Sequence, residues 1–180
     1  MTVHTIEKSS YPSDEAASKS SLQYRQHHAA PYFRCAVLDE HGEFPQVIGY
    51  ICSTRTTAFT AQSMSQHDSA GPILAMHSVA VQEPYRRKGI ATSMLADYLK
   101  AMEAMDDGIE CIQLLAKESL LGFYVKCGFQ VTQLSPIRHG KDMWFDLERK
   151  LNKDNLQAQQ ERPCWIVDSF AREGALGSGN

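Results

Sequence analysis

The chain has 180 residues, a formal net charge of −3, and 43% hydrophobic and 22% charged residues. This length fits one domain with a sizeable core, and the mild acidity gives no reason to expect nucleic acid or a membrane as partner. Its five cysteines are scattered and odd in number, which predicts reduced core thiols and not a disulfide framework. The sequence shows no zinc-type ligand spacing, signal peptide or membrane-length apolar run, so we expect a metal-free, cytoplasmic monomer.

The first half of the chain predicts a helix followed by a hairpin. Residues 14–26 are expected to be helical, with Ser13 as the N-cap. Residues 33–38 and 46–53 alternate or run apolar on either side of a short polar turn, which is typical of a β-hairpin. Residues 54–71 are polar and lack periodicity, so they predict a long loop, either a mobile connection or a flap over the substrate site.

The middle of the chain predicts a buried strand and a long helix. Residues 74–81 are apolar and partly β-branched, between Gly71-Pro72 and Pro84. From Ile90 to Met102 the apolar residues fall on one face of a helix.

The remaining elements complete a mixed α/β pattern. Residues 109–116 predict a strand, and residues 120–126 a short helix closed by Gly128 in a left-handed conformation. Residues 129–133 and 143–147 predict a final pair of strands. This order predicts a mixed central sheet flanked by helices.

The C-terminal part differs in composition. We expect one domain over residues 1–151 and a polar extension over residues 152–180. The extension carries one apolar cluster, Cys164-Trp165-Ile166-Val167, which either packs on the sheet or meets a partner.

The turn before the long helix has an unusual charge. Arg86, Arg87 and Lys88 stand where the positive end of the helix dipole disfavours cations. Exposed amides and fixed positive charge fit together there if an anion binds between them. Gly89 and Ala91 would let a phosphate approach the backbone, so the turn predicts a pyrophosphate site. It is neither a Walker loop nor a dinucleotide fingerprint.

The pattern R-x-x-G-x-A in this turn resembles motif A of the GNAT acetyltransferases, whose turn binds the pyrophosphate of acetyl-coenzyme A. The longer string HSVAVQEPYRRKGIATSMLADYL is similar to the corresponding segment of arylalkylamine (serotonin) N-acetyltransferases, especially their fungal relatives. The resemblance covers about residues 6–151 and includes LLGFYVKCGF. It implies the GNAT fold with acetyl-CoA as co-substrate and no metal. It also implies that the usual first strand is missing.

The resemblance further implies which residues contact the coenzyme. The backbone of Val79, Ala80 and Val81 would pair with the pantetheine arm like an added strand. The residues expected around the pyrophosphate are Arg87, Lys88, Gly89, Ile90, Ala91 and Thr92. Arg86 is a weaker candidate, because it could be a solvated charge.

Two residues are candidates for proton transfer. Tyr124 stands where GNAT enzymes place the general acid that faces the coenzyme sulfur; the alternative is a tyrosine packed under the sheet. His77 matches the histidine that serves in proton removal in the arylalkylamine enzymes, and a histidine pKa near 6.5 suits that task. The alternative is a core histidine. A second histidine, present two residues earlier in the vertebrate enzymes, is replaced here by Ala75.

Tyr11, Asp14 and Glu15 resemble the amine-facing segment of the family, although a plain helix start would look the same. We therefore predict an acetyl-CoA-dependent N-acetyltransferase of a small primary amine, most of all an arylalkylamine. Direct transfer in a ternary complex is expected. The alternatives are a polyamine acetyltransferase, a protein acetyltransferase with an open groove, and a non-catalytic acetyl-CoA-binding protein.

Overall fold

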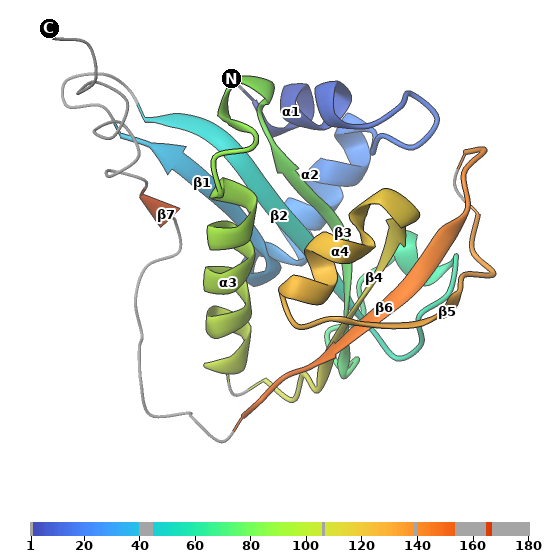
Figure 1. The fold of residues 1–180 in the computed structure, drawn as a ribbon. Coiled ribbons are helices and arrows are strands. Elements are labelled where there is room, and N and C mark those ends of the chain that lie inside the picture. The colour runs from blue at the N-terminus through green and yellow to red at the C-terminus, as the bar shows by residue number, and fades with distance from the viewer. Residues whose placement is uncertain (1, 40–44, 106, 139, 154–164, 167–180) are drawn as a thin grey trace, which may run out of the picture.

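The computed structural model describes residues 2–39, 45–105, 107–138, 140–153 and 165–166. Its centre is a seven-stranded mixed sheet in the order β5-β6-β4-β3-β2-β1-β7 (Figure 1). The strands are β1 (Phe33–Leu38), β2 (Gln46–Thr56), β3 (Ile73–Val81), β4 (Cys111–Lys117), β5 (Gln130–Leu134), β6 (Trp144–Lys150) and β7 (Trp165–Ile166). The expected mixed α/β class is confirmed.

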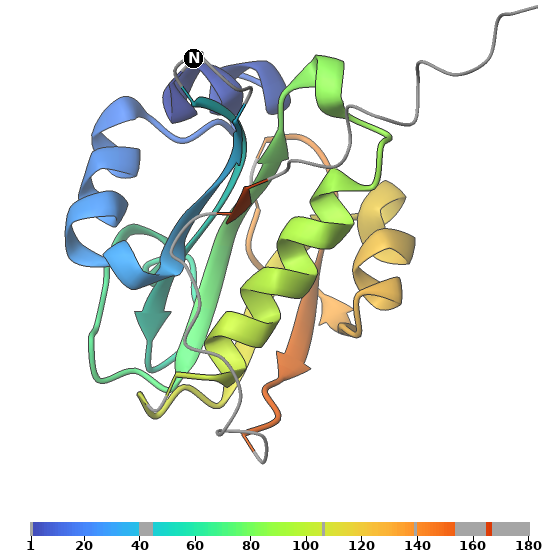
Figure 2. The ribbon, with the colours of Figure 1, turned by 90° about the vertical axis from the view of Figure 1, so that its left-hand side faces the viewer.

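Helices cover both faces of this sheet. The helices are α1 (Val3–Ser10), α2 (Lys19–His28), α3 (Ile90–Glu103) and α4 (Glu118–Lys126), with short 3₁₀ turns at Ala30–Tyr32, Ser63–Ser65 and Glu83–Tyr85. Figure 2 shows α1 and α2 on one side of the sheet and α3 and α4 on the other. We call these the α1–α2 side and the α3–α4 side.

The larger core lies on the α3–α4 side. Helix α3 buries the apolar stripe that the sequence predicts, including Met94, Leu95 and Tyr98, against the sheet. A smaller core lies under α1 and α2, where Ile6 and Leu22 pack against Tyr50 and Cys52 of β2. Burial of apolar surface on both faces therefore fixes the sheet between two helical layers.

The sheet opens at its centre. Strands β3 and β4 are parallel and joined through α3, and their pairing runs from Ile73–Cys111 to Met76–Leu114. Beyond that point β3 continues to Val81 and β4 to Lys117, without pairing to each other. A bulge in β3 falls at the same place, because Ser78 pairs with Cys52 of β2 while Met76 pairs with Ser53. His77 is the extra residue of this bulge.

The expected helix over residues 14–26 is wrong at its start. Helix α2 begins at Lys19, and Ser18 is its N-cap. Glu15 is instead held by Lys117, and the amide of Ala17 donates to Glu7. These tertiary contacts override the local preference for a helix start. The expected loop over residues 54–71 also begins later, because β2 extends to Thr56.

The other expected elements agree with the structure to within about two residues, except that β6 runs to Lys150, three residues beyond its expected end. The described residues 2–32 contain no strand. The outer edge of β1 is paired instead by β7, at Ala36 and Val37. Trp165 and Ile166 of the C-terminal cluster therefore lie on the sheet, whereas Cys164 and Val167 are outside the described residues. The division at residue 151 stays a prediction.

Candidate acetyl-CoA and amine site

The turn between β3 and α3 has the backbone of an anion site. Gly89 caps α3 at φ 79° without a side-chain hydrogen bond, and Arg87 is also left-handed at φ 63°. A Cβ atom added to Gly89 would meet nothing within 4 Å, so the space before the helix is open. The side chains of Arg87 and Lys88 are exposed there, with Lys88 Nζ 5.8 Å from the centre of the Tyr85 ring. Open amides and free cations fit a phosphate group.

The structure separates Arg86 from its two basic neighbours. Its Nε donates to the Val81 carbonyl at 2.8 Å, and its Nη2 donates to the Ser9 carbonyl at 3.3 Å and to Ser10 Oγ at 3.1 Å. Arg86 thus ties the turn to the end of α1. These hydrogen bonds explain why Arg86 stands in the turn, and no bound phosphate is needed to explain it.

The opening between β3 and β4 lies directly below the turn. Val79, Ala80 and Val81 are on the part of β3 that has no partner in β4, while their other edge pairs with β2. Backbone groups on such a free edge can pair with an extended ligand. Tyr11 and Arg86 already donate to the Val79 and Val81 carbonyls, and a contact of these three residues with a coenzyme stays a prediction.

Tyr124 approaches this opening from the α3–α4 side. Its side chain is packed edge-on against Phe123 and Phe129, with ring centroids 4.9 and 5.7 Å away, and the residue is 8% exposed. Burial raises the pKa of its hydroxyl well above the ordinary tyrosine value. Gly128, at φ 87°, ends α4 behind it as predicted. Tyr124 therefore carries a proton throughout the neutral range.

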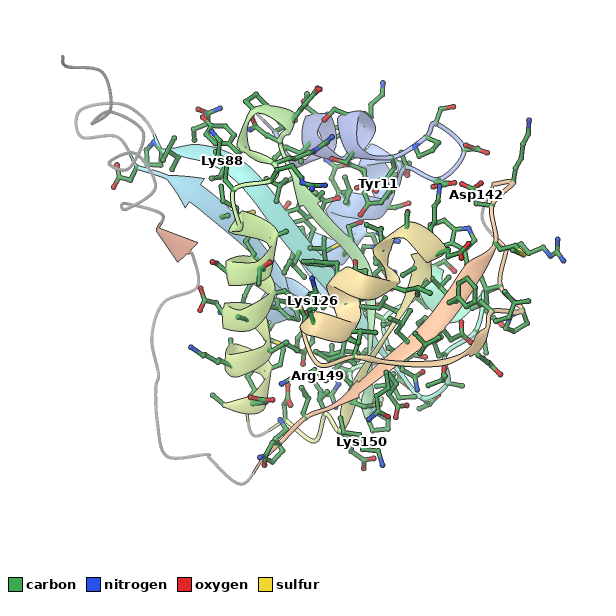
Figure 3. All side chains as sticks on the ribbon, in the orientation of Figure 1. Tyr11, Lys88, Lys126, Asp142, Arg149 and Lys150 are labelled. Carbon is green, nitrogen blue, oxygen red and sulfur yellow. The ribbon has the colours of Figure 1, made fainter. Side chains whose placement is uncertain are left out.

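Tyr11 approaches from the α1–α2 side. Its hydroxyl donates to the Val79 carbonyl at 3.5 Å. Burial raises the pKa of Tyr11, and the nearby Tyr124 hydroxyl adds to this rise. Tyr11 thus bonds Val79 and lies near Tyr124, although the three residues come from separate parts of the sequence. Figure 3 shows Tyr11 beneath α1 and Lys88 at the start of α3.

His77 lies in the bulge at the edge of the same opening. Its Nε2 is 2.7 Å from Thr54 Oγ1 on β2. This hydrogen bond orients the imidazole ring beside Ser78 and Val79. The position agrees with a residue that faces the acceptor, although its chemical role stays a prediction.

Asp14 and Glu15 are placed differently from Tyr11. Glu15 Oε1 binds Lys117 Nζ at 2.7 Å, and the same ammonium binds Asp142 Oδ2 at 2.7 Å (Figure 3 labels Asp142). Asp14 Oδ2 and Glu15 Oε1 both face Gly140 in the loop between β5 and β6. These two carboxylates therefore lie on the β4 side of the opening, whereas Tyr11 lies on the β3 side.

Glu7 is a site residue that sequence reasoning missed. It is 2% exposed, and its carboxylate accepts hydrogen bonds from the Ala17 amide at 2.8 Å, from the Tyr50 hydroxyl and from Ser78 Oγ at 3.4 Å. One signal was available, because Val3, Ile6 and Glu7 share one helical face. The buried carboxylate lies beside Ser78, next to the bulge of β3.

No group of three or more His, Cys, Asp or Glu side chains among the described residues could hold a metal ion. Within the same residues, no helix is long and apolar enough to cross a membrane. The described cysteines, Cys35, Cys52, Cys111 and Cys127, are free thiols.

Several solved structures share this architecture. The GphF GNAT-like decarboxylase, in complex with isobutyryl-CoA, has a TM-score of 0.68 at 16% identity, covering 83% of this chain and 93% of that chain. The loading GNATL domain of CurA from Lyngbya majuscula has a TM-score of 0.68 at 14% identity, covering 82% and 90%. The ribosomal-protein-S18-alanine N-acetyltransferase from Escherichia coli has a TM-score of 0.56 at 12% identity, covering 87% and 90%. At these identities the likeness defines a GNAT fold.

A family model places the chain more closely. The model of the Acetyltransferase (GNAT) family matches residues 1–129, which include the turn, β3, α3 and α4. The chain therefore belongs to the GNAT acetyltransferase family, whose co-substrate is acetyl-CoA. No curated protein sequence matches it.

Proposed function

We propose that this protein transfers an acetyl group from acetyl-CoA to a small primary amine, with arylalkylamines such as tryptamine and serotonin as the leading substrate class. The observation that carries the proposal is the Tyr11 hydroxyl, which donates to the Val79 carbonyl and lies near Tyr124 at the opening below a basic turn. Family membership supports an acyltransferase, and the resemblance of residues 77–99 to arylalkylamine enzymes supports the amine.

The coenzyme fits the turn by charge and by space. Gly89 leaves room for a phosphate, the amides of Ile90, Ala91 and Thr92 begin α3, and Arg87 and Lys88 add positive charge. Val79, Ala80 and Val81 lie where β3 has no partner in β4, so an extended arm could run beside them, next to the Tyr11 and Arg86 side chains. When bound, acetyl-CoA supplies an acetyl group activated as a thioester.

Tyr124 is the proposed proton donor. Because burial keeps its hydroxyl protonated, it can give a proton to a thiolate that leaves at the opening. Holding donor and acceptor together in one site removes much of the entropic part of the barrier.

His77 is the proposed route for proton removal. An alkylammonium has a pKa near 10.4 and is not a nucleophile at neutral pH, so the amine must lose a proton before attack. The Thr54 hydroxyl orients the His77 ring at the edge of the opening. A water molecule between amine and imidazole would complete the path.

The acceptor would lie beneath Tyr11, with Asp14 and Glu15 attracting its positive charge. Glu15 Oε2 is buried and has no hydrogen-bond partner among the described residues, so a cationic group would satisfy it. Glu15 and Asp142 bind the ammonium of Lys117, and Asp14 lies beside Glu15 at Gly140. Several carboxylates close together favour a second candidate, a polyamine.

The deciding experiment is a calorimetric titration with acetyl-CoA, followed by turnover assays on tryptamine, serotonin and spermidine. We expect binding, with a higher kcat/KM on the two arylalkylamines. Preference for spermidine would move the assignment to the polyamine class. Binding without turnover on any amine would indicate a non-catalytic acetyl-CoA-binding protein, and absence of binding would remove the coenzyme assignment.

A further inference from the structure

Residues 11–17, which we call the strap, cross the opening between β3 and β4. At one end the Tyr11 hydroxyl donates to Val79 on β3. At the other end Glu15 binds Lys117, the last residue of β4. Ala116 packs into the core on the α3–α4 side, so the Lys117 side chain projects to the α1–α2 side, where the strap lies.

The strap has a defined shape. The amides of Glu15 and Ala16 both donate to the Pro12 carbonyl, at 3.0 and 2.9 Å, which forms a tight turn in its middle. The Ala17 amide donates to Glu7, which fixes the C-terminal end to α1. Three separate anchors therefore hold seven residues over the opening.

A second loop closes on the strap from the other side. Gly140 belongs to the connection between β5 and β6, and a Cβ atom there would lie 2.9 Å from Glu15 Oε1 and 3.0 Å from Asp14 Oδ2. Lys117 joins the two segments, because its ammonium binds Glu15 in the strap and Asp142 in the loop, each at 2.7 Å. The same ammonium lies 5.1 Å from the centre of the Trp144 ring.

The two ion pairs of Lys117 differ in strength. The Glu15 side chain is 5% exposed, so its carboxylate depends on Lys117 for compensation of its charge. The Asp142 side chain is 58% exposed, and such a pair is weakened by solvent and salt. Lys117 is therefore the central member of the contact, and its loss would release both the strap and the loop.

We propose that Lys117 is a specificity-determining residue that locks the strap to the β5–β6 loop and closes the acceptor side against polypeptides. A peptide substrate needs a groove that is open at both ends, whereas here two segments meet across the opening. A compact amine needs no such open groove. This inference rests on the proposed function, since it concerns the acceptor of the same reaction.

The test compares Lys117→Met with the wild-type protein. Methionine keeps much of the apolar stem and removes the charge. Two substrates are compared: a short peptide with a free N-terminal amine, and tryptamine. We expect kcat/KM for the peptide, divided by kcat/KM for tryptamine, to rise by about tenfold or more in the variant. Lys126→Met is the matched control, because Lys126 is exposed on α4 (Figure 3), and it should leave the ratio unchanged.

A second variant and a second measurement distinguish loss of the contact between the strap and the β5–β6 loop from a general loss of stability. Gly140→Ala keeps all four charges and pushes the loop from Glu15, so it should change the ratio in the same direction. Amide hydrogen exchange of residues 13–17 should be faster in both variants, while that of α3 stays as in the wild type.

An unchanged ratio together with unchanged exchange in Lys117→Met would overturn the proposal. A wild-type protein that acetylates the peptide as readily as tryptamine would also overturn it. If the wild type binds acetyl-CoA but acetylates no amine, the proposed function fails. The contact made by Lys117 is then tested by amide hydrogen exchange alone. Faster exchange of the strap in Lys117→Met supports the contact, and unchanged exchange refutes it.

Discussion

Thr54 Oγ1 and His77 Nε2 lie 2.7 Å apart, so the extra residue of the β3 bulge is bonded through its side chain to β2. If His77 removes the amine proton, His77→Gln should lower kcat on the order of a hundredfold, the usual scale of one acid–base group. The acidic limb of the pH profile of kcat/KM should disappear with it. Acetyl-CoA affinity should not change. His27→Gln, on the exposed face of α2, is the control.

Thr54→Val tests the orientation of the ring without removing it. Valine has a similar shape but cannot hydrogen-bond to His77. We expect kcat to fall less than in His77→Gln and the acidic limb of the pH profile to move. Identical profiles for wild type and both variants would remove His77 from the reaction.

Tyr124→Phe should bind acetyl-CoA as tightly as the wild type and turn over about a hundredfold more slowly, because only a proton donor is lost. Its ring contacts with Phe123 and Phe129 do not involve the hydroxyl, so folding should be preserved. Because burial raises the pKa of Tyr124, its ionisation should not limit the wild-type rate below about pH 10. Unchanged turnover in the variant would leave Tyr124 with a packing role only.

Lys88→Glu should weaken acetyl-CoA binding by about tenfold or more, roughly 1.4 kcal/mol, because it reverses a charge at the open start of α3. The loss should shrink at high salt, where exposed charges are screened. Lys100→Glu makes the same charge change on an exposed face near the other end of α3, and it should have little effect. Calorimetric titration of both variants at two salt concentrations measures the difference.

Glu7→Gln should lower the free energy of unfolding by about 1–3 kcal/mol, since an amide cannot satisfy all the donors that the buried carboxylate now accepts. Denaturant unfolding gives this value directly. Glu118→Gln, in the exposed first turn of α4, should stay within about 0.5 kcal/mol of the wild type. An unchanged free energy of unfolding in Glu7→Gln would show that these hydrogen bonds do not depend on the carboxylate.

Cys52 should make the fold sensitive to alkaline pH. Burial raises the pKa of its thiol from 9.0 to about 11, although nearby Arg25 opposes the rise. The unfolded chain then ionises at lower pH than the folded one. The stability linked to Cys52 is therefore complete below pH 9 and is lost as the pH rises to about 11, up to about 3 kcal/mol. Cys52→Ala should show a shallower loss over this range in thermal unfolding. Equal slopes would contradict the assignment.

Local features were predictable from the sequence because they depend on residues that are neighbours in the chain. Gly128 was placed correctly, since a left-handed residue after the C-terminal end of a helix favours glycine. Glu7 and Lys117 were not, because their bonds join residues far apart in the sequence: Ser78 is 71 positions from Glu7, and Glu15 is 102 positions from Lys117. The same long-range contact explains why residues 14–17 are not helical, although their composition suits a helix start.

Arg86 has a consequence for how the two ligands would act on each other. The residue follows β3 in the turn, and its guanidinium reaches Ser9 and Ser10, immediately before Tyr11. An anion that immobilises the turn therefore also restrains the N-terminal end of the strap. Amine binding then has less of the strap left to order, so its entropy cost is smaller. By thermodynamic linkage the amine must then tighten coenzyme binding by the same factor as the coenzyme tightens amine binding. Arg86→Ala should uncouple the two, leaving each affinity independent of the other ligand.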